Sequence, residues 1–150
     1  MADQDQIPTL VAVASNPTQL QAAQRIAARK LLGYDGEVFP ADGCAITLSV
    51  LLQQAGIPVP DTFRAIELGE ILASTRNWVK VGIGGQQIGD IGSTCGSTAE
   101  HGSDHIYLVL KVLNSDEMVI ADNQSDSPHF RFASGAGGKT PTTFFLRAPA

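Results

Sequence analysis

Hydrophobic positions in the first half of the chain recur at the three- and four-residue spacing of helices, whereas later ones form short runs typical of strands. A first helix is predicted after Ser15-Asn16-Pro17, which supplies a cap residue and a proline at the first helical position. Its end is predicted at Gly33. The hydrophobic positions of this helix are Leu20, Ala23, Ala27 and Leu31.

Two further helices are expected before position 78. The second runs from about Cys44 to Ala55, because Asp42 or Gly43 can cap its start and Gly56 can end it. It is apolar on most sides, which predicts that it is buried. A third helix is predicted after a cap at Asp61, and its hydrophobic residues are Phe63, Ile66 and Ile71.

From Trp78 onward the hydrophobic runs are short and are separated by polar or glycine-containing segments, which predicts strands. The predicted strands cover residues 78–81, 88–91, 105–113, 118–123, 129–132 and 142–147. A hairpin turn at Asn114–Glu117 joins two of them. Helices grouped before an antiparallel sheet predict an α+β fold, formed by residues 1–150 as a single domain.

Composition and charge narrow the class of protein. The 150 residues are 43% hydrophobic, which is enough for one core without a disulfide scaffold, and the net charge is −5. The basic residues are scattered, so nucleic-acid binding is not expected. The apolar runs are too short to span a bilayer, and the acidic start lacks the basic region of a secretory signal. We therefore expect synthesis in the cytoplasm.

Cys44 is the first candidate for chemistry, because the prediction places it at the N-terminus of a buried helix. Unpaired N–H groups and the positive end of the helix dipole favour a thiolate, so a lowered pKa is expected for this cysteine. The same N–H groups can hold a developing oxyanion. The alternative is an inert, buried cysteine that acts as a small hydrophobic residue.

His105 is the second candidate, since it opens an otherwise apolar strand and can serve as a general base there. If the hairpin closes through two residues, Val109 faces Asp122, and His105 shares a face with Asp122 and Gln124; a bulge would bring Asn123 there instead. Any of the three side chains could orient the imidazole. The alternatives are a surface histidine and an ordinary polar strand end.

The order of these residues resembles the NlpC/P60 cysteine peptidases, with the related CHAP amidases as a close second. The resemblance covers residues 34–124: a tyrosine, the cysteine-bearing helix with its Gly-Ile-x-x-Pro turn, the sequence IGDIG, and the sequence SDHIYLVL. It implies a papain-like core, in which Cys44 is the nucleophile and His105 the base. The third catalytic residue, which orients the histidine, is Asn123, or Asp122 by the CHAP pattern. By the same resemblance Tyr34 lines the active site.

The resemblance further implies hydrolysis of peptidoglycan stem peptides by a bacterial or phage endopeptidase or amidase. A phage particle or a contact-dependent secretion system would deliver the chain to the cell wall, and a small immunity protein is a conceivable partner. The sequence departs from the family where Gly43 and Ala45 flank Cys44 and where Tyr34 lacks the following Trp-Gly-Gly. A non-catalytic assembly module and a cysteine protease or deamidase acting on proteins are the alternatives.

Other candidate sites carry weaker signals. Cys95 is a rival nucleophile without a predicted helix N-terminus, and a bridge to Cys44 is not expected in a reducing compartment. Zinc binding by His101 and His105 would need helical spacing, which the intervening glycine and serine disfavour, although neighbouring Cys95, Glu100 and Asp104 could add ligands. No metal or cofactor is therefore expected.

Overall fold

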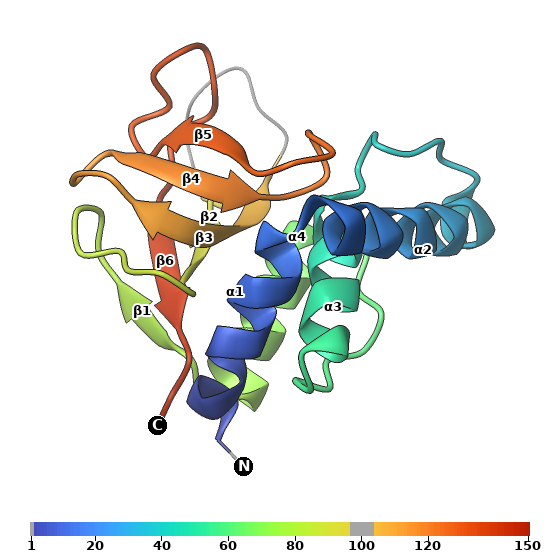
Figure 1. Cartoon of the computed structure of the whole chain (residues 1–150), viewed down its shortest axis with the longest axis horizontal. Coiled ribbons are helices and arrows are strands. Elements are labelled where there is room, and N and C mark those ends of the chain that lie inside the picture. Colours follow the sequence, from blue (N-terminus) through green and yellow to red (C-terminus); the bar gives the residue numbers. More distant parts are fainter. Residues whose placement is uncertain (1, 97–103) are drawn as a thin grey trace.

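The computed structural model describes residues 2–96 and 104–150 and has an α+β fold with helices packed on an antiparallel sheet (Figure 1). Its first half is helical, as the hydrophobic spacing predicts. The helical elements are the 3₁₀ helix η1 (Asp3–Gln6), α1 (Ile7–Ser15), α2 (Pro17–Asp35), α3 (Cys44–Gln54), α4 (Ala65–Glu70) and the π-helical turn η2 (Ile71–Thr75).

The caps of α2 and α3 explain where these helices begin and end. The Asn16 side chain accepts a hydrogen bond from the Gln19 N–H at the start of α2, as the capping pattern predicts. The helix ends at Asp35, two residues after the predicted end at Gly33. The residue that ends it is Gly36, which adopts the left-handed conformation with φ of 76°. Gly43 is the N-cap of α3, and nine residues of this helix are buried.

The prediction for α4 is less accurate. Asp61 does not cap this helix, whose N-cap is Arg64. The Asp61 carboxylate instead accepts hydrogen bonds from Lys30 at 2.8 Å and from Gln53 at 2.9 Å, which ties the loop to α2 and α3. The helix α1 is not among the predicted helices, because a proline can interrupt a helix. Pro8 instead lies in the first turn of α1, where no intrahelical N–H donor is needed.

The sheet has the strand order β1-β6-β2-β3-β4-β5, and all of its pairs are antiparallel. The strands are β1 (Val79–Val81), β2 (Ile91–Ser93), β3 (Ile106–Val112), β4 (Glu117–Ala121), β5 (His129–Phe132) and β6 (Phe144–Arg147). The helices gather on one side of this curved sheet (Figure 1). The last strand of the chain therefore lies in the interior of the sheet, between β1 and β2.

The predicted register of the β3–β4 hairpin is wrong. Val109 pairs with Ile120 instead of Asp122, and the register shifts between Val109 and Lys111. Two features cause the difference. The turn is longer than two residues because the Asn114 side chain accepts hydrogen bonds from two following N–H groups, and the bulge adds one more residue to β3.

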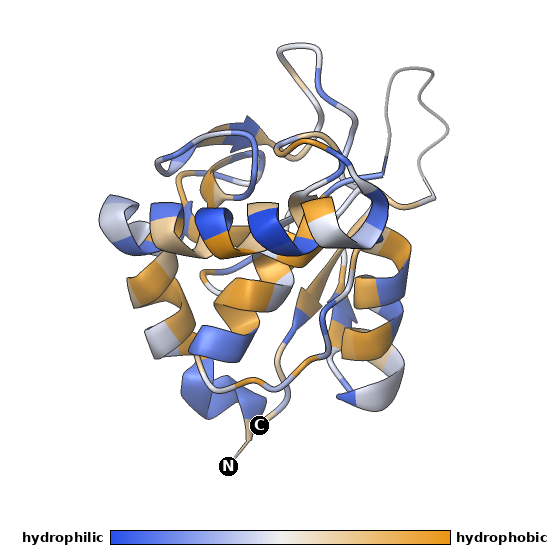
Figure 2. Ribbon diagram, turned by 90° about the vertical axis from the view of Figure 1, so that its right-hand side faces the viewer, coloured by the Kyte–Doolittle hydropathy of each residue, from blue (hydrophilic) through white to orange (hydrophobic). Residues whose placement is uncertain are grey.

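Alternate residues of β3 belong to two hydrophobic clusters on opposite faces of the sheet. Ile106 and Leu108 pack with the helices, and Tyr107 and Val109 pack with residues of β4 and β6. Figure 2 shows helices in which hydrophobic residues alternate with hydrophilic ones along the ribbon, as expected of helices that cover a sheet, whereas α3 is buried over nine consecutive residues. This packing places the start of α3 near the start of β3, where Cys44 and His105 lie.

Candidate active site

Cys44 is the first residue of α3, and the segment before it is tightly packed. A Cβ atom at Gly43 would lie 2.9 Å from the ring of Phe39 and 3.2 Å from the Pro40 carbonyl oxygen. A side chain at position 43 would therefore displace this ring, which gives a local reason for the glycine before Cys44. The thiol is 8% exposed and lies at the wall of a cavity.

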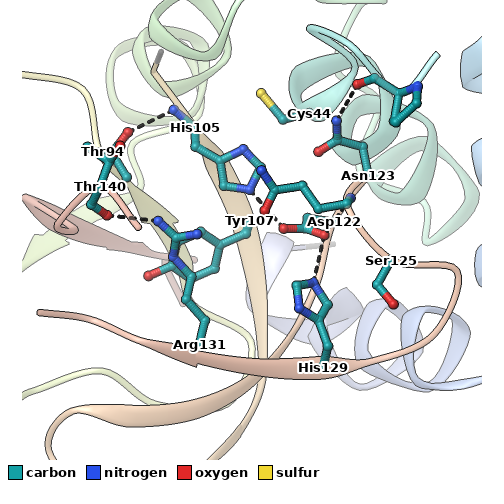
Figure 3. A network of polar contacts seen from close by, with 12 residues as sticks. Cys44, Thr94, His105, Tyr107, Asp122, Asn123, Ser125, His129, Arg131 and Thr140 are labelled. Carbon is teal, nitrogen blue, oxygen red and sulfur yellow. Dashed lines mark hydrogen bonds and ion pairs between the residues drawn. The ribbon is translucent and has the colours of Figure 1, made fainter. Parts of the chain in front are cut away.

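The Cys44 sulfur lies against the backbone on both sides of His105. The Asp104 carbonyl oxygen is 4.0 Å from the sulfur, and the Ile106 N–H also interacts with the sulfur. Cys44 and His105 line the same cavity of about 390 Å³, together with Pro40 and Asn123. The structure thus brings together the two residues that the sequence predicts as nucleophile and base, and Figure 3 shows both side chains in this site.

Asp122 holds the His105 ring. It directly follows β4, and its Oδ2 lies 2.8 Å from His105 Nε2. Asp122 is buried, which raises its pKa, but the hydrogen bonds from His105 and His129 outweigh that effect and hold the pKa well below its ordinary range. The carboxylate is therefore ionised, so His105 Nε2 carries the proton, and Nδ1 is the ring nitrogen that can accept one.

A second histidine contacts the same carboxylate. His129, the first residue of β5, has its Nε2 2.8 Å from Asp122 Oδ1, and the Gln124 N–H donates to that oxygen at 2.8 Å (Figure 3). Two imidazoles, one directly before β3 and one on β5, thus share one buried carboxylate. Sequence reasoning did not identify His129, which lies 24 positions from His105 in a short strand without a motif of its own.

Hydrogen bonds to the backbone hold both His105 and Asp122 in place. Thr94 accepts from the His105 N–H through its side chain at 2.8 Å and donates its own N–H to the His105 carbonyl at 3.0 Å. Gln24, a buried residue of α2, donates to the carbonyl oxygens of Asp122 at 2.8 Å and Ser125 at 2.7 Å. Gln24 was also missed; a polar residue on the apolar face of a predicted helix is the signal that could have found it.

The other predicted orienting residues have different contacts. Asn123 donates its Nδ2 to the Pro40 carbonyl at 2.7 Å, and its buried Oδ1 has no hydrogen-bond partner among the described residues. Gln124 lines the cavity, and it contacts Asp122 through its backbone N–H. Of the three alternatives left open by the sequence, Asp122 is the one that forms a hydrogen bond with His105 in the described part of the chain.

The thiol pKa differs from the sequence expectation. Burial raises the pKa of Cys44 to about 11, and the N–H groups of Ile106 and Ala45 offset this only in part; the Asp122 charge raises it further. The expected lowering at the helix N-terminus is therefore wrong for this site. The resting thiol is protonated at neutral pH, so a reactive thiolate requires transfer of its proton to a base.

A second cavity, of about 350 Å³, is also lined by Cys44. It contains Tyr34 and Phe63, whose rings stack with centroids 3.9 Å apart and an interplanar angle of 5°. Arg64 and two acidic residues shared with the first cavity, Asp42 and Asp104, also line it. Cys44 therefore lines two cavities, and Tyr34 lines one of them.

The rival sites gain no support. Cys95 is a free thiol that lines a different cavity from Cys44, and it is not bonded to Cys44. His101 and Glu100, the other candidate zinc ligands, lie outside the described residues. Within residues 2–96 and 104–150, no group of three or more His, Cys, Asp or Glu side chains could hold a metal ion.

No protein-family model, curated protein or solved structure shows significant similarity to the chain. In the part of the chain that the structure describes, no helix is both long enough and apolar enough to cross a bilayer.

Proposed function

We propose that the protein is a cysteine-dependent amide hydrolase with a papain-like core. One observation carries the proposal: Cys44 and His105 line one cavity, while Asp122 binds His105 Nε2 and leaves Nδ1 as the ring nitrogen that can accept the thiol proton. A nucleophile, a base and a group that orients the base are the parts that such a reaction requires.

In the proposed reaction, His105 Nδ1 takes the Cys44 proton as the sulfur attacks the carbonyl carbon of the amide. The oxyanion that forms is stabilised by the Cys44 N–H at the start of α3. The imidazolium then protonates the leaving nitrogen, the C–N bond breaks, and a thioester remains on Cys44. Water, deprotonated by His105, attacks the thioester and releases a carboxylic acid and the thiol.

The high thiol pKa favours this general-base route over a permanent thiolate–imidazolium pair. Asp122 supports it electrostatically, because the positive imidazolium forms beside an ionised carboxylate. The buried site strengthens that attraction relative to water. His105 thus accepts the proton of the buried thiol, and Asp122 stabilises the imidazolium that results.

Two cavities that share Cys44 as a lining residue suit a peptide that extends beyond the cleaved bond. Together with the resemblance to NlpC/P60 peptidases, this favours a peptidoglycan stem peptide as the substrate, cut by an endopeptidase or amidase. Delivery by a phage particle or a secretion system would bring the protein to the cell wall, where a small immunity protein could block the cleft in the producing cell.

Digestion of purified muropeptides by the wild type and by Cys44→Ala and Cys95→Ala variants, analysed by mass spectrometry, tests the proposal. The matched cysteine change is the control, since Cys95 lines another cavity. We expect new amide-cleavage products from the wild type and Cys95→Ala, and none from Cys44→Ala. Cleavage that persists in Cys44→Ala would overturn the assignment of the nucleophile.

One observation favours a second candidate, a non-catalytic binding or assembly module that retains the fold: burial raises the pKa of Cys44, as in an inert thiol. Such a module would cleave neither muropeptides nor proteins. A protease or deamidase acting on proteins would instead leave muropeptides intact and modify a protein substrate, which mass spectrometry of candidate proteins would detect.

A further inference from the structure

His129 contacts a group that the proposed mechanism already uses. Its Nε2 lies 2.8 Å from Asp122 Oδ1, on the same carboxylate whose Oδ2 binds His105. The Asp122 side chain is fully buried, whereas the His129 side chain is 26% exposed. The imidazole of His129 thus reaches from the surface to a buried charge.

The place of His129 in the fold makes this contact notable. It begins β5, which is the last strand in the sheet order and pairs with β4 through His129 and Ile120. A partly exposed position on such a strand accepts many residue types, and Phe130 beside it is 65% exposed. The hydrogen bond to Asp122, and not the packing of β5, therefore distinguishes His129 from its neighbours.

The geometry shows what this bond does. The torsion that rotates an aspartate carboxylate is soft, so contacts must fix its orientation. Oδ1 of Asp122 accepts hydrogen bonds from His129 and from the Gln124 N–H, which leaves Oδ2 directed at His105. Without His129, one backbone donor alone would hold Oδ1.

We propose that His129 is a positioning residue: it fixes the Asp122 carboxylate so that His105 keeps its Nε2–H tautomer and presents Nδ1 to Cys44. This inference rests on the proposed function. His129 is not among the described residues that line either cavity beside Cys44, so it acts through Asp122 and not on the substrate. Its loss should therefore lower kcat and leave KM unchanged.

The test is the rate of Cys44 alkylation by iodoacetamide at neutral pH, measured by intact mass in a Cys95→Ala background. His129→Leu should lower the rate about tenfold, the effect of one lost hydrogen bond to a charged group. His129→Gln, whose Nε2 can replace the imidazole donor, should stay within about twofold of the unsubstituted protein. Phe130→Leu changes the adjacent residue of β5 and should have no effect.

Nitrogen NMR of the histidine rings gives an independent readout, since it reports the His105 tautomer directly. We expect Nε2–H in the wild type and in His129→Gln, and a mixture of tautomers in His129→Leu. Equal alkylation rates in wild type and His129→Leu would overturn the inference, as would a His129→Gln rate as low as that of His129→Leu. If His129→Leu does not fold, His129→Asn, whose shorter amide does not reach Asp122, replaces it with the same expected loss.

His105→Ala in the same assay separates this inference from the proposed function. If His105→Ala alkylates as fast as the wild type, His105 does not activate the thiol and the proposed function fails. If His105→Ala lowers the rate and His129→Leu does not, the proposed function stands and the positioning role of His129 fails.

Discussion

Replacement of Asp122 by asparagine keeps the size of the side chain and removes its charge. In the wild type, Oδ1 accepts from His129 and from a backbone N–H, and Oδ2 accepts from His105. An asparagine that keeps its oxygen at the Oδ1 position turns an NH₂ group toward His105 Nε2. The ring must then accept at Nε2 and carry its proton on Nδ1, where it cannot take the proton of Cys44.

The magnitude follows from the lost hydrogen bond. A hydrogen bond to a charged group contributes about 1.5–3 kcal/mol, and each 1.36 kcal/mol corresponds to a factor of ten in rate, so Asp122→Asn should lower kcat/KM by about 10- to 150-fold. The wrong tautomer adds to this loss. The same substitution should lower the free energy of unfolding, because two imidazoles lose a charged partner in a buried position.

Muropeptide cleavage rates and urea unfolding provide the assays, and Asp126→Asn is the control because it makes the same charge change at an exposed position nearby. The pKa of Asp122 is lowered in the folded state, so its contribution to stability is present above the unfolded pKa of about 3.9 and is lost as the pH falls further. The stability difference between wild type and Asp122→Asn should therefore shrink in acid. Unchanged kcat/KM in Asp122→Asn would refute the assigned role.

Two further predictions concern the fold. A Cβ atom at Gly92 would lie 2.2 Å from the ring of the buried Tyr107, so Gly92→Ala should lower the free energy of unfolding by about 3 kcal/mol in urea titrations; a loss below about 1 kcal/mol would contradict this packing. Asp3 forms hydrogen bonds with Arg76 at 2.7 Å and Trp78 at 2.8 Å, and its lowered pKa means that this stabilisation disappears in acid. Asp3→Asn should destabilise the protein by about 1–3 kcal/mol at neutral pH, and this difference should shrink as the pH falls below the unfolded pKa of about 3.9; a pH-independent difference would argue against the ion pair.

The helices and the α+β order were predictable because their signals are local. Asn16 before a proline and Gly43 before a buried run of residues are features that neighbouring positions determine. The helix α1 was missed because a proline can either interrupt a helix or occupy its first turn, and the surrounding sequence does not distinguish these cases.

The sequence predicted which residues form the site better than it predicted the contacts between them. Cys44 and His105 each follow from a residue type at the end of an element, but the choice of Asp122 depends on the β3–β4 register. Residues 106–110 are apolar throughout, so alternation could not reveal the bulge. His129 depends on how β5 pairs with β4, which is a tertiary property.

The most direct test of the account is the pH dependence of Cys44 alkylation in Cys95→Ala and in Cys95→Ala/His105→Ala. Proton transfer from the sulfur to His105 predicts a rate at neutral pH about tenfold or more above that of the double variant, whose thiol should react only as the pH approaches its raised pKa of about 11. Superimposable profiles that rise only in strong alkali would contradict the account.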